Sequence, residues 1–303
     1  MPIPVPYPAV APTEYIPGDL PTLTLSRGDV DLYLTLAAGW AILPGVEGLD
    51  DPPRALIEVE PATWDGSLLT GARYQQREVF LPLNYRAGST AALRSTTRAL
   101  AALLDVKRGP VTLEVAHNDG TRRYIDGYLS APFGAPLASR EATLWRQFGV
   151  TLRCPDPFYY GDERTLSFQL GGTPPEFLSD EFMPVQVAES QVLGDTVITN
   201  PGDADAYPVW TLTGPFDEAT IEVGETLWTV PDGLAEDEVL VVDARRGQQT
   251  VTLDDVASWT TLGPGAQLAA LPPGDTDLDV TITGATSATV LTVTWQERWL
   301  TAW

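Results

Sequence analysis

Cysteine and histidine are almost absent from this chain of 303 residues, which contains one of each. A single cysteine cannot form an intramolecular disulfide, and one cysteine with one histidine cannot assemble a four-ligand Cys/His zinc site. A Ser-His-Asp or Cys-His nucleophile would have to use His117, for which a surface position beside a turn is the alternative. We therefore expect no metal, no cofactor and no catalytic site of these classes.

Long apolar runs are also absent, and none approaches the length of about eighteen residues that a membrane span requires. The first residues are apolar but are interrupted by prolines, and they lack the basic start of a signal peptide. We interpret residues 1–30 as an extended proline-rich arm. We expect no association with a membrane.

Basic residues are scarce in the second half of the chain. Residues 1–161 contain 14 basic and 17 acidic residues, whereas residues 162–303 contain 4 basic and 24 acidic residues, and the net charge of the whole chain is −23. So acidic a surface would repel phosphate groups. The second half is therefore not expected to bind nucleic acid, and the two halves should present different surfaces.

The first half predicts β structure with long connections and one helix. Short strand-like runs occur at residues 32–36, 56–60 and 73–83. Residues 89–104 have leucine or threonine at positions 93, 97, 100 and 104, which is the spacing of one helical face, and Ser89 or Thr90 can cap the start. This helix should pack on the sheet by its leucines.

Residues 111–115 and 123–129 flank Asp119 and Gly120, a pair that tolerates the positive φ angles of a tight turn, and so predict a β-hairpin. Basic side chains on the helix and around this hairpin either face water or contact a partner protein. The candidate partner contacts are Arg94, Arg98, Lys107, Arg108, Arg122 and Arg123.

An aromatic motif follows the last strand of the first half, which spans residues 144–152. Two prolines without amide protons cannot continue a strand ladder, so the chain should leave the sheet here. Three aromatics then supply large apolar area, which suits the corner between two domains, and the cysteine should be buried. This junction motif comprises Cys154, Pro155, Asp156, Pro157, Phe158, Tyr159, Tyr160 and Gly161.

The second half predicts an all-β sandwich or jelly roll, because it consists of short β-branched runs separated by Gly, Pro and Asp. The clearest hairpin joins residues 241–243 to residues 250–252. The predicted strands are residues 165–170, 196–198, 209–212, 220–223, 226–230, 239–243, 249–253, 278–282 and 290–295.

The order of these features resembles the distal tail protein family of long non-contractile-tailed bacteriophages. The junction motif closes the first domain, residues 200–210 open the sandwich, and residues 271–274 precede a last strand that ends in residues 295–299. The resemblance covers most of the chain from about residue 30 onward. The proline-rich arm and an insertion at residues 171–184 depart from the family pattern.

The resemblance implies a mainly β structural protein and not an enzyme. A ring-forming β-rich domain with one helix would span residues 31–161, and a galectin-like peripheral sandwich residues 162–303. Six copies would form a ring in the virion at the tail tip or baseplate, joining the tail tube protein to the tail-tip hub protein, with the tape-measure protein as a further partner. Phage DNA would pass through the lumen without specific binding.

Three other interpretations rest on particular residues. Galectin-like sandwiches bind sugars, so a carbohydrate-binding module is the main alternative if a tryptophan among Trp210, Trp228, Trp259 and Trp295 is exposed instead of packed in the core. A glycoside hydrolase needs two carboxylates, but residues 236–238 and 254–255 have the pattern of solvated turns. Residues 274–279 place three Asp at alternating positions, which fits either a calcium site or an acidic loop before a strand.

Overall fold

The computed structural model describes residues 21–303 except 62, 135–143, 171–184 and 188–190. Most of the predicted arm and the whole of the insertion at 171–184 lie outside the described residues. Residues 22–27, expected within the arm, instead form strand β1 (Thr22–Arg27), because alternating Leu23 and Leu25 are buried. No helix in the described part of the chain is long and apolar enough to cross a membrane.

The chain divides into two compact units. The first unit comprises residues up to 47 and residues 78–155, and the second comprises residues 48–77 and 156–303. In this division residues 48–77 group with the second half of the chain, and the second half begins at Asp156. The contacts of Arg77 given below supply the physical reason.

The first unit contains one curved sheet with the strand order β3-β6-β9-β8-β7-β1-β2. Its strands besides β1 are β2 (Val30–Tyr33), β3 (Trp40–Ile42), β6 (Arg77–Arg86), β7 (Val111–Ala116), β8 (Arg122–Leu129) and β9 (Trp145–Cys154). The predicted strand at residues 32–36 is partly wrong, because a 3-10 helix, η1 (Leu36–Ala38), begins after Thr35 caps it.

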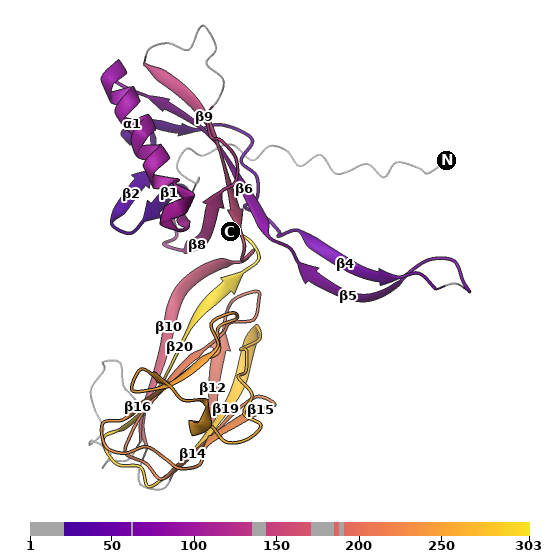
Figure 1. Cartoon of the computed structure of the whole chain (residues 1–303), viewed down its shortest axis with the longest axis vertical. Coiled ribbons are helices and arrows are strands. Elements are labelled where there is room, and N and C mark those ends of the chain that lie inside the picture. The colour runs from indigo at the N-terminus through magenta and orange to yellow at the C-terminus, as the bar shows by residue number, and fades with distance from the viewer. Residues whose placement is uncertain (1–20, 62, 135–143, 171–184, 188–190) are drawn as a thin grey trace. The chain divides into compact units, whose positions relative to one another are not determined.

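The predicted helix is confirmed as α1 (Thr90–Leu103), which runs alongside strands of the first unit in Figure 1. The hydroxyl of Ser89 accepts a hydrogen bond from the backbone amide of Ala92, as expected of a helix cap. Leu100 and Leu104 are buried, so the apolar face packs inward as predicted. After the helix comes the 3-10 helix η2 (Val106–Arg108).

The hairpin predicted around Asp119 is also confirmed. Strands β7 and β8 pair in antiparallel register from Val111 opposite Gly127 to Ala116 opposite Arg122. The Asp119 carboxylate accepts a hydrogen bond from the Thr121 amide, and Gly120 has a φ of 90°. The turn chemistry therefore acts as the sequence indicates.

The second unit is a β-sandwich with one projecting ribbon (Figure 1). One sheet has the order β18-β17-β16-β13-β20-β10, with β11 parallel to β10, and the other has the order β12-β19-β14-β15. Its strands are β10 (Tyr159–Leu170), β11 (Val185–Val187), β12 (Gln191–Asn200), β13 (Val209–Thr213), β14 (Glu218–Val223), β15 (Thr226–Val230), β16 (Val239–Asp243), β17 (Thr250–Leu253), β18 (Val256–Ala257), β19 (Gly274–Thr283) and β20 (Thr289–Trp299), with the 3-10 helix η3 (Trp259–Thr261).

The two sheets share one apolar core, which confirms the predicted mainly β fold. Alternating residues of both sheets contribute to it, for example Ile221 and Val280 from one sheet and Leu240 and Leu291 from the other. Each predicted strand of the second half lies within an observed one, apart from Gln249, which precedes β17. Strands β11 and β18 were not predicted, because they have three and two residues.

The outer face of the four-stranded sheet is acidic. Asp275, Asp277 and Asp279 are exposed and alternate along β19 with buried residues, so the segment is part of the strand itself and not a loop before it. Glu222 of β14 stands directly opposite Asp279. No lysine or arginine occurs in the four strands of this sheet.

Candidate functional site

A two-stranded ribbon is formed by β4 (Arg54–Val59) and β5 (Leu68–Tyr74). From here on we call this ribbon the arm, and it is distinct from the proline-rich arm predicted at residues 1–30. The register pairs Ile57 with Gly71 and Val59 with Leu68, with an irregularity between Ile57 and Glu58. Alternation then places Leu56 and Leu69, which are 60% and 56% exposed, on one side of the ribbon. A second apolar group lies on the other side, where Arg73 stands opposite Ala55. This surface, the arm face, comprises Ala55, Ile57, Val59, Leu68 and Gly71.

The arm face is open to solvent in a single chain. Ile57, Val59 and Leu68 are 50–53% exposed, although all three are large apolar side chains. The methyl end of Ile57 lies over Gly71, where an added β-carbon would be 3.7 Å from Ile57 Cδ1. Two-stranded ribbons are marginally stable alone in water, and exposed apolar side chains in one group make this face a candidate interaction surface.

The base of the arm is held by Arg77, which is 1% exposed. Its guanidinium donates hydrogen bonds to the backbone carbonyls of Pro157 (2.7 Å) and Gly48 (2.8 Å), and also to those of Asp50 and Leu300. The same group lies over the ring of Tyr159, 4.7 Å from its centroid. The acceptors explain why residues 48–77 belong to the second unit.

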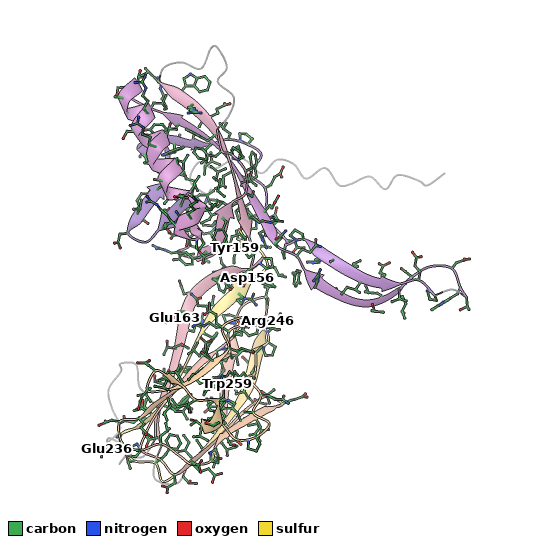
Figure 2. All side chains as sticks on the ribbon, in the orientation of Figure 1. Asp156, Tyr159, Glu163, Glu236, Arg246 and Trp259 are labelled. Atoms are coloured by element: carbon green, nitrogen blue, oxygen red, sulfur yellow. The ribbon has the colours of Figure 1, made fainter. Side chains whose placement is uncertain are left out.

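The junction motif leaves the strand ladder where the prolines stand, as predicted. Strand β9 ends at Cys154, and β10 begins at Tyr159, which is labelled with Asp156 in Figure 2. Cys154 is fully buried, as expected. The proposal that the aromatics fill a corner between two domains stays a prediction, and the contacts described for them lie within the second unit.

Asp156 is the polar centre of this motif. Both of its carboxylate oxygens accept hydrogen bonds from Arg298 at 2.9 Å, and the hydroxyl of Tyr160 donates to the same carboxylate. The Arg298 guanidinium also lies 4.1 Å from the ring centroid of Phe158 and 5.2 Å from that of Tyr207. A planar cation between aromatic faces and a bidentate carboxylate is strongly positioned.

Gly161 closes the motif because the strand has no room for a side chain. The pairing of β10 with β20 is irregular between Tyr160 and Glu163. A β-carbon on Gly161 would lie 2.6 Å from Glu297 Oε2 and 2.9 Å from Trp299 Nε1. The glycine therefore lets the buried Glu297 carboxylate approach the backbone, where it also pairs with Arg164.

The predicted basic contacts divide by exposure. Arg94 and Arg98 are exposed on α1, as are Lys107 and Arg108 in η2. The remaining two behave differently. Arg122 is exposed and pairs with Glu114 at 3.3 Å, whereas Arg123 is 8% exposed and its guanidinium donates to the Arg122 carbonyl, so it offers little surface to a partner.

Sequence reasoning missed the arm face, Arg77 and Arg298 as contact-making residues. The sequence predicts one strand over residues 73–83, but residues 75–76 separate β5 from β6 in the structure. The sequence does contain a signal for strand β5, because Leu68 and Leu69 follow a Gly-containing turn. The partners of Arg77 are backbone carbonyls, for which no sequence pattern exists.

The candidate metal and sugar sites can be compared with the part of the chain that the structure describes. Within the described ranges, no three His, Cys, Asp or Glu side chains converge in a way that could hold a metal ion. Trp210, Trp228 and Trp295 are 1–4% exposed and belong to the core. Trp259, at 52%, is the one exposed tryptophan of the four considered for sugar binding.

Burial of the Tyr160 hydroxyl raises its pKa, and the Asp156 carboxylate raises it further, while Arg298 opposes both effects. In the unfolded chain the Tyr160 hydroxyl loses its proton near pH 10, whereas in the folded chain it keeps the proton to higher pH. The contribution of Tyr160 to the free energy of unfolding is therefore fully present below about pH 10 and decreases above it. We expect Tyr160→Phe to reduce that fall, measured as urea midpoints at about pH 8 and about pH 10.5. Tyr33→Phe, at an exposed tyrosine, is the control; equal falls in wild type and Tyr160→Phe would contradict the expectation.

Comparisons with known proteins agree with the architecture. No protein-family model and no curated protein matches the chain. The crystal structure of Dit from phage SPP1, described as a paradigm of the hub adsorption apparatus in phages that infect Gram-positive bacteria, is 15% identical and covers 91% of this chain and 98% of its own, with a TM-score of 0.63. A chain of the phage p2 baseplate in its activated conformation is 9% identical over 92% of this chain and 98% of its own, with a TM-score of 0.52. The protein therefore has the fold of the phage distal tail proteins, as the sequence resemblance implied.

Proposed function

We propose that the protein is a structural subunit of a phage tail tip, which assembles as a ring of six copies. The ring joins the tail tube protein on one side to the hub or baseplate protein on the other, with the tape-measure protein as a further contact. Phage DNA passes through its lumen without sequence-specific binding. The function is one of geometry and involves no turnover of a substrate.

The single observation that carries ring formation is the arm face. Ile57, Val59 and Leu68 expose half or more of their surface, and among the residues that the structure describes the ribbon pairs with no third strand. Covering this surface with a neighbouring copy removes apolar area from water at about 25 cal/mol per Å². The resemblance to a ring-forming family makes a second copy of the chain the occupant that we propose.

Other exposed groups fit the remaining contacts. Arg94 and Arg98 lie four residues apart on α1, which contains no acidic residue. We propose that this helix face and the β7–β8 hairpin contact tail proteins. The exposed Trp259 keeps glycan binding as the second candidate role for the sandwich, and saturable binding of host polysaccharide that Trp259→Ala abolishes would establish it.

Val59→Asp tests the ring directly. Placing a charge in the copy-to-copy contact is expected to weaken self-association by about 100-fold or more, because the carboxylate would lose its hydration without gaining a partner. Light scattering should show a wild-type mass near six times the 32.7 kDa of one chain, and the variant should remain monomeric. Negative-stain images of the same samples should show six-fold rings for the wild type alone.

Val256→Asp is the matched control, since Val256 is an exposed strand valine of the sandwich at 68% exposure. It introduces the same charge outside the arm and should leave the ring intact. A wild-type protein that stays monomeric at every concentration would overturn self-assembly. A Val59→Asp protein that forms rings as well as the wild type would remove the arm face from the contact.

A further inference from the structure

Four segments that are separated in the sequence meet at the base of the arm. Residues 48–53 and 74–77 lead into and out of the ribbon, residues 157–159 belong to the junction motif, and residues 300–303 follow β20. Arg77 belongs to the segment 74–77, and its guanidinium donates to backbone carbonyls in the other three segments. Its acceptors Pro157 and Leu300 lie 80 and 223 residues away in sequence.

Further contacts join the same segments. The Tyr159 hydroxyl donates to the Gly48 carbonyl at 3.0 Å, and Tyr74 packs edge-on against Phe158 with ring centroids 5.2 Å apart. The segment after β20 is attached to the entry of the arm twice. The Ala302 amide donates to the Leu49 carbonyl at 2.8 Å, and Trp303 Nε1 donates to the Asp50 carboxylate at 2.7 Å.

The contacts of Arg77 require several hydrogen-bond donors arranged in one plane. Its three nitrogens distribute hydrogen bonds over four carbonyls, and its flat face stacks on Tyr159. A lysine ammonium is a compact point charge with three donors and no planar face, so it cannot reproduce this pattern. An arginine at this position therefore holds segments together in a way that depends on its shape as well as its charge.

We propose that Arg77 clamps the arm to the sandwich so that the two move as one rigid body. The consequence of this clamp depends on the proposed function. When the arm face docks on a neighbouring copy, that neighbour fixes the orientation of the sandwich. Arg77 is thus a positioning residue, which transmits the docking of the arm to the peripheral part of the same chain. The hydrogen bonds from residues 300–303 to Leu49 and Asp50 attach the same end of the arm to the segment after β20.

The test measures distances within one chain and does not require a ring. Spin labels at Asp65→Cys, in the turn of the arm, and Glu225→Cys, in the β14–β15 turn, report the separation of arm and sandwich in the full-length protein. Both sites are exposed, whereas the native Cys154 is buried and stays unlabelled. Excess unlabelled protein removes signals between copies if rings form.

We expect one narrow distance distribution with Arg77 present and a distribution about twofold broader or more in Arg77→Lys. Arg73→Lys makes the same chemical change at an exposed position of β5 and should leave the distribution narrow. A broad distribution in the otherwise wild-type protein would overturn the clamp. So would an Arg77→Lys distribution as narrow as that of the control.

A second variant keeps the test decisive if Arg77→Lys does not fold. Tyr159→Phe combined with Trp303→Phe removes two donors at the arm base and introduces no unpaired charge. It should broaden the distribution less than Arg77→Lys but more than Arg73→Lys, and an unchanged distribution in this folded double variant would count against the clamp. Loss of rings in the preceding assembly experiment would leave these results standing, because they concern a single chain.

Discussion

Replacing Arg298 by alanine is expected to lower the free energy of unfolding of the second unit by about 2–3 kcal/mol. Arg298 is 7% exposed and contacts Asp156 with two hydrogen bonds, so its loss leaves a carboxylate without its cation. The Asp205 carbonyl also loses its donor at 3.0 Å. The packing of the guanidinium against Phe158 and Tyr207 is lost at the same time.

Urea unfolding followed by tryptophan fluorescence measures this change. Arg246→Ala is the matched control, because Arg246 is exposed and lies 5.2 Å from the centroid of the same Tyr207 ring. We expect that control to cost no more than about 1 kcal/mol. A loss for Arg298→Ala that is no larger than the loss for Arg246→Ala would show that the Asp156 contact does not hold the junction motif.

Trp228→Ala is expected to destabilise the sandwich by about 3–5 kcal/mol. Trp228 is 1% exposed and packs edge-on against Trp210 with ring centroids 6.0 Å apart. The two rings come from different sheets, since Trp228 lies on β15 and Trp210 on β13. Removing one ring therefore leaves a cavity where the sheets meet, which the rest of the core cannot fill without moving.

The same urea titration provides the comparison, with Trp259→Ala as the control of identical chemistry at an exposed position. That variant should change the free energy of unfolding by less than about 1 kcal/mol. Trp228→Phe should fall between the two, because it retains part of the apolar volume. Equal costs for Trp228→Ala and Trp259→Ala would mean that the two-ring contact does not join the sheets.

Local patterns in the sequence were sufficient for most strands and for the helix. The short β-branched run in residues 239–243 and the cap at Ser89 are local, so they can be recognised without knowledge of the fold. The same holds for the turn at Asp119 and Gly120. Each depends on spacing or backbone preference, which a sequence displays directly.

The contacts that organise the second unit could not be predicted in the same way. Arg298 and Asp156 are 142 residues apart, and one Arg–Asp pair among many is not marked by any spacing. Arg77 binds backbone carbonyls, which every residue possesses. Arg123 was grouped with exposed basic residues, yet its alternation along β8 turns it inward. Tertiary packing determines which distant residues become partners and which side chains of a strand point into the core.

The resemblance to a known family supplied what local patterns could not, namely the two-part architecture. It did not reveal the arm face, because apolar residues at 55–59 are as typical of a buried strand as of an exposed ribbon. Only the structure shows that Ile57 and Val59 are uncovered. The candidate site was thus accessible at the level of the junction motif, but not at the level of the contact surface.

The aspartates of β19 have a consequence for crowding. Asp275, Asp277 and Asp279 face outward with Glu222 opposite the last of them, and the same sheet has no basic residue to neutralise them. When several copies are held close together, like charges on these faces repel over a range of about 10 Å at 0.1 M salt. These charges lie on the face of the sheet, so they oppose face-to-face contact between the sandwiches of two copies.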